Sequence, residues 1–425
     1  MPGPRICWLT EEFPPETGGT GMVAARIARA LAPHVPVCVV TRQLRPARPA
    51  RDRFGQARVR RIRPAGVLKG AGWRALPALA FYLARLTFLL TSEARRYDII
   101  VVSSMKIMPL VAVPICRLLR KRCIVRLESP FELVQPIAAE SLSSMGSLVS
   151  RPLSRLLGVM QRYVLARADC VIAISHDIEA RLREVSCPPE RILRLPNPID
   201  LERFRPIGED ERRAMRERLG LPLARTLVLY VGRLSRAKGV LLLIEAWREL
   251  IDRHPNLYLV FAGSGKGSWD SCEDELKQQA RAGGLDASVR FVGETDRVEH
   301  YMQAADLYVL PSEYEGFSLS IGEALGCALP AVVTSVGAAP ELIRDGVNGY
   351  LFAPKDRRAL IEAVSTALEQ RDRWPQLRRL ARETAERFGL QQIVCQYLAL
   401  FRTLARARGA VRDLQTARRG PGEPW

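Results

Sequence analysis

The 425-residue chain has few of the residues from which metal sites and disulfide frameworks are built. Its nine cysteines include no C-x-x-C pair, and its four histidines lie far apart. Scattered cysteines are typical of free thiols in a reducing compartment, and isolated histidines do not form a zinc site. The chain also contains no Asp-x-Asp sequence. We therefore expect no disulfide bonds and no bound metal ion.

Long apolar runs are absent as well. The most hydrophobic stretch, at 76–90, is short and carries Arg85, whereas a helix that spans a bilayer needs about 20 apolar residues. We interpret this stretch as an amphipathic or core helix. The first residues of the chain lack the long apolar segment of a secretory signal peptide. We therefore expect a cytoplasmic protein.

Acidic residues are outnumbered by basic ones. Lysine and arginine number 64, aspartate and glutamate 45, and the net charge is +19. Such an excess favours an anionic partner, whether nucleotide phosphates, lipid headgroups or nucleic acid. Aromatic residues make up only 7% of the chain and do not alternate with the basic ones, and no nucleic-acid-binding module is recognisable. Nucleic-acid binding is therefore a remote alternative, and we expect no nucleic-acid partner.

Short strand-like runs alternate with helical stretches in two series along the chain. The runs lie at 5–9, 35–40, 98–102, 123–127 and 170–174 in the first series, and at 226–232, 257–263, 289–293, 307–311 and 330–334 in the second. This alternation predicts βαβ units and parallel sheets. A proline-rich segment at 195–206 separates the series. The predicted fold is α/β, with two Rossmann-like, doubly wound domains that face each other across a cleft.

The predicted domain boundaries follow from this division. We place an N-terminal domain at 1–196 and a C-terminal domain at 197–385. A helix is expected at 386–407, packing back toward the N-terminal domain, and residues 408–425 are expected to form a flexible basic tail.

Two glycine-rich segments imitate phosphate-binding motifs. GTGMVA at 19–24 matches G-x-G-x-x-A, but it begins about ten residues past the first strand, whereas a dinucleotide fingerprint turns directly off its strand. GSGKGS at 263–268 lacks the first glycine of a phosphate loop, because Val260 stands in that place. Neither segment supports a dinucleotide cofactor, and we expect no cofactor at all.

The segment PSEYEGFSLSIGE at 311–323 carries the strongest chemical signal. Glu315 and Glu323 stand eight residues apart, on either side of a turn that follows an apolar strand. Gly316 lets the backbone approach a ligand closely, and the helix that begins after the turn exposes free N–H groups to an anion. Glu323 can bind a ribose diol, and Glu315 can hold sugar hydroxyls. The same pattern also fits an ordinary helix start with acids favoured by the helix dipole.

A second segment, VGRLSRAKGV at 231–240, directly follows the first strand of the C-terminal domain. Gly232 ends this strand, and Arg233 and Lys238 follow five residues apart. Two cations at the carboxyl end of a strand suit a diphosphate, because guanidinium binds phosphate oxygens in a bidentate way. Each cation alone would be an ordinary surface residue. Together with Glu315 and Glu323, they indicate a nucleotide-sugar site.

Taken together, VGRLSRAKG, FAGSG, VRFVG and the long segment from PSEYEGF to GYLF resemble the retaining glycosyltransferases of family 4, which have the GT-B fold. The resemblance covers nearly the whole chain and is densest from 226 to 355. It implies a hexosyltransferase that moves a sugar from a nucleotide-diphosphate sugar to an acceptor hydroxyl, retains the anomeric configuration and needs no metal. The implied setting is the synthesis of cell-envelope glycans, polysaccharides or glycolipids.

The resemblance also implies a role for each motif residue. Arg233 and Lys238 would bind the donor diphosphate and neutralise the leaving group. Glu323 would hold the ribose, and Glu315 would contact the donor sugar and phosphates. The backbone at Gly316, Phe317, Ser318 and Leu319 would contact the donor sugar and phosphates together with Glu315. The backbone at Val292, Gly293 and Glu294 would meet the base. Gly232 is a further implied donor contact, and Gly19, from the first domain, would touch the donor or the acceptor at the closed cleft.

One position departs from the family pattern. Many relatives carry a histidine after the fourth or fifth strand of the first domain, where this chain has Glu128 in CIVRLESPFEL. Glu128 either replaces that histidine as a catalytic contact or is a loop acid paired with Arg126. His176, in ISHDI, is expected instead to open a helix behind Ser175, a residue type that favours the N-cap.

The first domain is strongly basic between its second and third predicted strands. From Arg42 to Arg74 the only acid is Asp52. The resemblance implies that this domain binds the acceptor, and a basic domain with amphipathic helices suits an anionic membrane. We expect a glycan or lipid-linked acceptor, with peripheral contact at the inner face of the membrane. Soluble acceptors remain an alternative, as do a GT-B-fold phosphorylase and a nucleotide-sugar epimerase.

Overall fold

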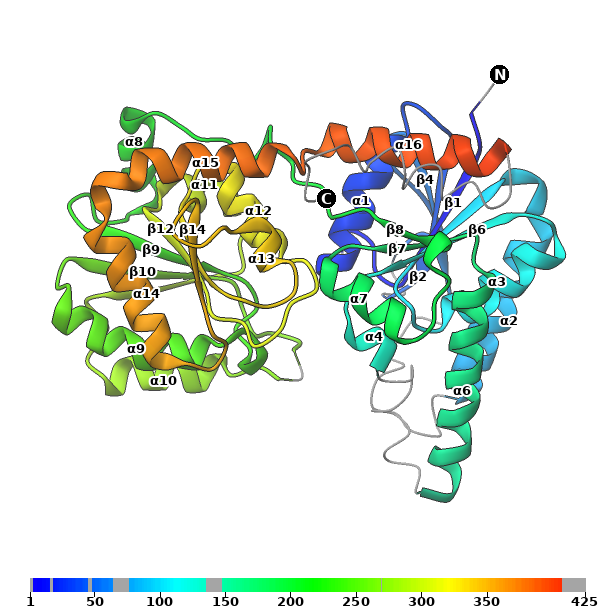
Figure 1. Ribbon diagram of the computed structural model, residues 1–425, viewed down its shortest axis with the longest axis horizontal. Helices are drawn as coiled ribbons and strands as arrows, with labels where there is room; N and C mark the ends of the chain where they lie inside the picture. Colours follow the sequence, from blue (N-terminus) through cyan, green and yellow to red (C-terminus); the bar gives the residue numbers. More distant parts are fainter. Residues whose placement is uncertain are drawn as a thin grey trace. The chain divides into compact units, whose positions relative to one another are not determined.

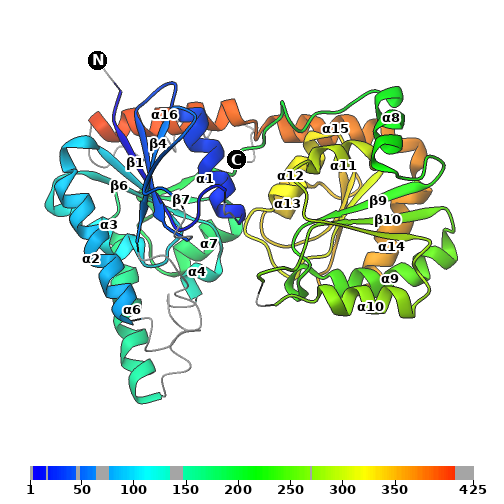
Figure 2. The same ribbon diagram turned by 180° about the vertical axis from the view of Figure 1, so that it is seen from behind.

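The computed structural model describes residues 3–15, 18–44, 48–63, 76–134, 147–268 and 270–406. The chain divides into two compact units, one of Met1–Pro198 with Leu390–Trp425 and one of Ile199–Gly389. Each unit is built on one sheet with helices on both faces (Figure 1, Figure 2). The two Rossmann-like, doubly wound domains predicted from the sequence are therefore confirmed.

The first unit contains an eight-stranded sheet in the order β3-β4-β2-β1-β5-β6-β7-β8. Its strands are β1 (Ile6–Thr10), β2 (Val37–Arg42), β3 (Arg51–Phe54), β4 (Ala57–Ile62), β5 (Ile99–Ser103), β6 (Arg122–Leu127), β7 (Cys170–Ala173) and β8 (Ile192–Arg194). β3 pairs antiparallel with β4, and the other neighbours are parallel. Central strands such as β5 are buried along their whole length, because helices cover both faces of the sheet.

The helices of the first unit form two layers. They are α1 (Gly19–Leu31), α2 (Leu76–Ser92), η2 (Ala94–Arg96), α3 (Met108–Leu118), α4 (Phe131–Val134), α6 (Ser147–Arg167), α7 (His176–Glu184), η4 (Pro189–Arg191) and α16 (Leu390–Arg406). α1 packs against α16, and α3 packs against both α2 and α6. Among the described residues, no helix is both long and apolar enough to cross a membrane.

Helix α16 comes from the end of the chain but belongs to the first unit (Figure 1). The ring of its Tyr397 lies 5.7 Å from the ring of Trp8, and Arg122 donates a hydrogen bond to the Leu404 carbonyl at 2.9 Å. The structural boundaries fall after Pro198 and Gly389, whereas the sequence placed them after residues 196 and 385. The tail expected at 408–425 lies outside the described residues.

The second unit contains a fully parallel six-stranded sheet in the order β11-β10-β9-β12-β13-β14. Its strands are β9 (Thr226–Val231), β10 (Leu257–Ala262), β11 (Val289–Gly293), β12 (Leu307–Leu310), β13 (Ala331–Thr334) and β14 (Gly349–Phe352). Counted along the chain, the order is that of the dinucleotide-binding doubly wound fold, and it reverses between β9 and β12. Ligands of such sheets bind outside the carboxyl ends of the strands at this point.

Helices cover both faces of this second sheet. They are α8 (Glu209–Leu219), η5 (Arg236–Lys238), α9 (Val240–Arg253), α10 (Glu273–Ala282), α11 (Val298–Ala304), α12 (Leu319–Gly326), α13 (Ala339–Leu342), α14 (Arg357–Glu369), η6 (Arg371–Arg373) and α15 (Trp374–Glu386). α9 packs against α10 and α14 on one face, while α8, α11, α12 and α15 lie together on the other (Figure 1, Figure 2). Large side chains such as Trp247 and Tyr230 are fully buried in the core.

Candidate functional site

Two of the predicted motifs meet at the carboxyl edge of the second sheet. β9 ends at Val231 and β12 at Leu310, and these strands flank the point where the strand order reverses. VGRLSRAKG follows β9, and PSEYEGFSLSIGE follows β12. Motifs about 80 residues apart in sequence are thus adjacent in space, because the carboxyl ends of neighbouring parallel strands meet at one edge of a sheet.

The segment after β9 is packed tightly against the end of β12. Gly239 has φ +68°, and a Cβ atom added there would lie 1.9 Å from the carbonyl oxygen of Pro311. Glycine is therefore needed both for the left-handed backbone and for the close approach. The amide of Glu313 also donates a hydrogen bond to the carbonyl of Ala237 at 2.9 Å. These contacts hold Lys238 next to the second motif.

Lys238 and Glu315 form an ion pair at this edge. Lys238 Nζ lies 2.5 Å from Glu315 Oε1, and the two side chains are only 20% and 9% exposed. Ser312 Oγ donates a hydrogen bond to the same oxygen at 2.8 Å, and Thr334 Oγ1 donates one to the Ser312 carbonyl at 2.7 Å. Partial burial strengthens the attraction of such a pair relative to one in water. The structure therefore places a fixed cation and a fixed carboxylate side by side.

Arg233 lies exposed at the end of β9. Its backbone carbonyl accepts a hydrogen bond from the Tyr230 hydroxyl at 2.7 Å, which fixes the start of the loop. Its side chain donates to Ser268 Oγ at 3.4 Å, a weak contact that a better acceptor can replace. The neighbouring Arg236 instead forms an ion pair with Glu275, so its charge is already balanced.

The turn after β12 leads into helix α12. Phe317 is buried, and its ring lies 5.8 Å from that of Phe388, so its side chain anchors the turn in the core. Ser318 is the N-cap residue but makes no side-chain cap hydrogen bond. The first amide groups of α12 therefore remain available to another acceptor. Free amide groups of this kind are what an anion binds at the start of a helix. Glu323, further along the helix, is 7% exposed.

The residues expected beside the base lie at the same edge, at the end of β11. Val292 and Gly293 are half-buried there, and Glu294 is exposed. The amide of Gly263 donates a hydrogen bond to the Gly293 carbonyl at 2.8 Å, which ties the ends of β10 and β11 together. Gly232, at the end of β9, completes the row of strand ends. Their contacts with a donor stay predictions.

The two predicted residues of the first unit lie at the carboxyl ends of its strands. Gly19 is the exposed first residue of α1. Glu128 follows β6 and forms an ion pair with Arg126, which is one of the two alternatives left open by the sequence. Arg126 is fully buried and also donates a hydrogen bond to Asn197 Oδ1. The catalytic contact considered for Glu128 stays a prediction.

The prediction for His176 is confirmed. α7 begins at His176, and the Oγ atom of Ser175 accepts a hydrogen bond from the amide of Ile178 at 3.3 Å. Ser175 is thus the N-cap of α7, as its residue type favours.

Sequence reasoning missed Glu132, which lies in α4 just behind β6. Its Oε2 atom accepts hydrogen bonds from the amides of Met105 at 2.9 Å and Glu128 at 3.3 Å. Burial raises the pKa of Glu132 from 4.5 to about 7. A carboxyl group with this pKa changes its protonation near neutral pH, as general acids and bases do. The sequence shows only an acid shortly after a strand, which is a weak signal.

Comparison with known proteins identifies the family. Residues 18–198 match the glycosyl transferase 4-like domain, and residues 211–387 match glycosyl transferases group 1. The chain therefore belongs to the glycosyl transferases group 1 family, and it is a glycosyltransferase.

Two relatives illustrate this membership. The lipopolysaccharide core biosynthesis mannosyltransferase LpsB of Rhizobium meliloti is 31% identical over 249 residues, which cover 58% of this chain and 68% of LpsB. D-inositol 3-phosphate glycosyltransferase 2 of Catenulispora acidiphila is 35% identical over 245 residues, or 56% of each chain. The matched region thus spans between about half and two thirds of these relatives.

Solved structures with the same fold extend over nearly the whole chain. Sucrose-phosphate synthase from Thermosynechococcus elongatus has a TM-score of 0.76 and 23% identity, covering 94% of this chain and 99% of its own. HepE of Anabaena in complex with UDP-glucose has a TM-score of 0.72 and 22% identity, covering 95% and 100%. These similarities confirm the GT-B fold.

Proposed function

We propose that this chain is a retaining hexosyltransferase that moves a sugar from a nucleotide-diphosphate sugar to an acceptor hydroxyl. The observation that carries this proposal is the Lys238–Glu315 pair at the reversal point of the second sheet. A lysine suits phosphate oxygens and a carboxylate suits sugar hydroxyls, so the pair supports a site for both parts of such a donor. The UDP-glucose complex of HepE, which shares the fold, favours the same donor class.

The proposed reaction asks for charge stabilisation more than for covalent chemistry. The bond from the anomeric carbon to the diphosphate oxygen breaks, and the diphosphate leaves with the electron pair. Arg233 and Lys238 stabilise the charge that develops on it. The acceptor oxygen bonds to the same face of the anomeric carbon and gives its proton to the leaving phosphate, so the configuration is retained. Because two side chains supply the positive charge, we propose that the reaction needs no metal ion.

The other motif residues would position the donor. Glu323 would accept hydrogen bonds from the ribose diol, and Glu315 would hold sugar hydroxyls. The uncapped start of α12 supports phosphate binding by the backbone from Gly316 to Leu319. The end of β11 would contact the base.

Nucleotide binding tests the donor site directly. Thermal unfolding is measured in metal-free buffer with UDP, GDP, ADP and their common sugars, on the wild type and on Lys238→Ala, Glu323→Ala and Arg236→Ala. We expect one nucleotide to stabilise the wild type and Arg236→Ala but neither of the other variants. Arg236 is the matched control, because it lies in the same loop but is paired with Glu275. Folded protein that no nucleotide stabilises would contradict the proposal.

Turnover assays separate the proposal from its rivals on the same fold. A transferase consumes the nucleotide sugar only when an acceptor is present. A phosphorylase would instead need inorganic phosphate, and an epimerase would convert the donor alone. Phosphate-dependent release of a sugar 1-phosphate, or a change of the donor sugar without acceptor, would replace the proposed reaction.

The first unit offers a surface suited to a membrane. Its exposed apolar side chains on α2, α3 and α6 are Phe81, Phe88, Leu118, Leu156, Val159 and Tyr163. Neither α2 nor α6 contains an acidic residue, while Arg85 and Arg162 are exposed on them. Apolar side chains beside basic ones suit an anionic membrane surface. We therefore propose an envelope glycan or lipid-linked acceptor and a peripheral position at the inner face of the membrane.

Vesicle binding tests the membrane contact. We expect the protein to sediment at low salt with phosphatidylglycerol vesicles and to stay in solution with phosphatidylcholine vesicles. Phe88→Ser combined with Leu156→Ser should abolish sedimentation. Leu223→Ser is the control, since Leu223 is also exposed but belongs to the second unit. Protein that stays wholly in solution with acidic vesicles would refute the contact.

A further inference from the structure

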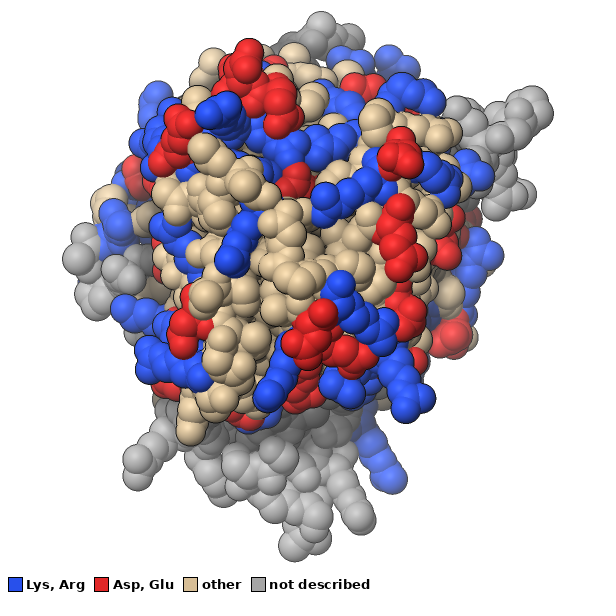
Figure 3. Space-filling view, turned by 90° about the vertical axis from the view of Figure 1, so that its left-hand side faces the viewer, with Lys and Arg blue, Asp and Glu red and all other residues tan. Residues whose placement is uncertain are grey.

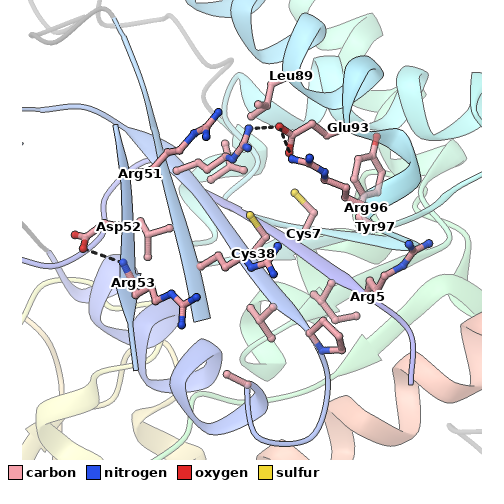
Figure 4. A pocket seen from close by; sticks show the side chains of 18 of the residues that line it. Arg5, Cys7, Cys38, Arg51, Asp52, Arg53, Leu89, Glu93, Arg96 and Tyr97 are labelled. Atoms are coloured by element: carbon pink, nitrogen blue, oxygen red, sulfur yellow. Dashed lines mark hydrogen bonds and ion pairs between the residues drawn. The ribbon is translucent and has the colours of Figure 1, made fainter. Parts of the chain in front are cut away.

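A pocket of about 990 Å³ lies in the first unit, away from the predicted site residues. It is bounded by the first residues of β1 and β2, by the β3–β4 hairpin and by the end of α2 (Figure 4). Six arginines line it: Arg5, Arg51, Arg53, Arg58, Arg60 and Arg96. Gly19 and Glu128 follow the carboxyl ends of β1 and β6, so the pocket opens at the other edge of the sheet.

The pairing of β3 with β4 sets the positions of four of these arginines. Arg51 is directly opposite Arg60, and Arg53 is directly opposite Arg58. Because alternate residues of a strand point to the same face, all four guanidinium groups leave the same face of the hairpin. Like charges directly opposite each other on paired strands destabilise the sheet. The register therefore concentrates positive charge at a cost to the fold.

Residues on the other face of the hairpin pack against neighbouring parts of the first unit. Asp52 forms an ion pair with Arg61 at 2.9 Å, and the ring of Phe54 lies 5.3 Å from that of Phe13. Asp52 also lines the pocket, but its ion pair is with Arg61 and not with any of the six arginines. Packing of the hairpin therefore does not explain the arginines.

Nearby carboxylates balance only part of the charge. Glu93 pairs with Arg60 and, at 3.4 Å, with Arg96, while Arg5 pairs with Asp98 at 2.7 Å. Within the described part of the chain, Arg51, Arg53 and Arg58 have no ion-pair partner. All three are exposed, so a ligand can reach them.

The floor of the pocket adds no charge. Cys7 and Cys38 are neighbours in the β1–β2 register and both line the pocket (Figure 4). Burial raises the pKa of both thiols, so they are neutral at physiological pH. The positive charge of the walls therefore dominates the chemistry of the pocket.

We infer that this pocket is an anion-binding site for a ligand that carries two or more phosphate groups, separate from the proposed donor site. Arginine matches phosphate because its planar guanidinium donates two parallel hydrogen bonds to one phosphate. The three unpaired guanidinium groups can therefore hold more than one phosphate. The phosphates belong either to a free small molecule or to lipid headgroups, and two arms of one experiment separate these sources.

The first arm measures calorimetric binding of inorganic pyrophosphate at low ionic strength. All proteins carry Lys238→Ala, so that the proposed donor site contributes little. Arg53→Gln with Arg58→Gln removes one opposed pair. Arg248→Gln with Arg281→Gln is the control, because these arginines are exposed on α9 and α10 and the net charge changes equally. We expect at least about tenfold weaker binding in the pocket variant and unchanged binding in the control.

Thermal unfolding shows whether the pocket variant is correctly folded. Without anion, the pocket variant should unfold at a higher temperature than its parent, because like charges no longer face each other. With pyrophosphate, the parent should gain more stability than the variant. A misfolded variant would show the opposite shift without anion.

The second arm measures sedimentation with vesicles of phosphatidic acid and phosphatidylcholine. Loss of sedimentation in the pocket variant but not in the control would assign the site to lipid headgroups. Weaker pyrophosphate binding in the pocket variant, with sedimentation equal to that of the control, would assign it to a free ligand. If the pocket variant and the control behave alike in both arms, the inference is overturned.

Discussion

Asp306 of the second unit and Glu132 and Arg53 of the first differ in how their charges are balanced. In the second unit, buried Asp306 pairs with Arg216 at 2.7 Å and with Arg212, and it accepts a hydrogen bond from the Leu227 amide at 2.7 Å. The surface of this unit also carries basic and acidic residues interspersed (Figure 3). In the first unit, Glu132 has no ion pair among the described residues, and neither does Arg53.

This difference separates paired charges, which stabilise the fold, from charges without an ion-pair partner, which a proton or a ligand can neutralise. Removal of one partner of a buried ion pair leaves the other charge buried without compensation. Such a substitution should therefore lower the free energy of unfolding. A charge without a partner costs stability until a proton or a ligand neutralises it. Variants at Asp306 and Lys238 should therefore lose stability or activity, and variants at Glu132 and Arg53 should respond to pH and anions.

Asp306→Ala should have the largest effect. It leaves Arg212 and Arg216 in a buried place without their counter-charge, which costs about 3–5 kcal/mol. Burial already lowers the pKa of Arg212 to about 10. Denaturant unfolding measures the loss. Glu209→Ala is the control, because Glu209 also pairs with Arg212, at 3.5 Å, but is 83% exposed, so its loss should cost under about 1 kcal/mol. Equal losses of unfolding free energy in Asp306→Ala and Glu209→Ala would contradict the difference expected between a buried and an exposed ion pair.

Lys238→Ala should come next, through activity. Removal of one group that stabilises the leaving diphosphate is expected to lower kcat by about 10²–10³-fold. Steady-state assays with the donor nucleotide identified by thermal shift measure the effect. Arg236→Ala should stay within a few fold of the wild type. Full activity in Lys238→Ala would remove this lysine from the proposed site.

Glu132→Gln should change the pH dependence of stability. Because the pKa of Glu132 is about 7 in the folded protein and 4.5 is its ordinary value, folding favours the protonated form. That contribution is complete below about pH 4.5 and is lost as the pH rises through 7. The wild type should therefore lose up to about 3 kcal/mol relative to Glu132→Gln between these values. Unfolding curves measured from pH 4.5 to 8 check this, and parallel curves would contradict it.

Arg53→Gln should have the smallest effect and the opposite sign. Removal of one of two opposed cations should raise the free energy of unfolding by about 0.2–1 kcal/mol at low salt. The gain should shrink in 1 M salt, because screening weakens the repulsion. Denaturant midpoints at both salt concentrations measure it, with Arg248→Gln as control. A destabilised Arg53→Gln would mean that the arginine is paired in solution.

Much of the second unit could be predicted from the sequence, because its signals are local. A strand that ends at Val231 and a cation seven residues later already place Lys238 at a sheet edge. The order of a doubly wound sheet then brings Glu315 to the same edge. Short-range patterns could not show that Phe317 points into the core, because Phe388, which contacts it, lies 71 residues away.

The first unit was harder to predict, because its important features depend on pairing. Arg51, Arg53, Arg58 and Arg60 were visible only as an excess of charge. Arg51 and Arg53 face Arg60 and Arg58 because of the register of β3 and β4, and a shift of one residue would send the arginines of the shifted strand to the other face. The pKa of Glu132 likewise depends on burial among residues from β5 and beyond.

The sequence by itself determined the alternation of strands and helices, the division into two sheets and the residues that follow each strand of the second unit. These features depend on hydrophobic period and local backbone preference, which are read within a few residues. The tertiary structure alone decided which charges are paired, where α16 packs and which arginines oppose one another. Those outcomes depend on contacts between distant segments, because burial and register arise only when the chain has folded.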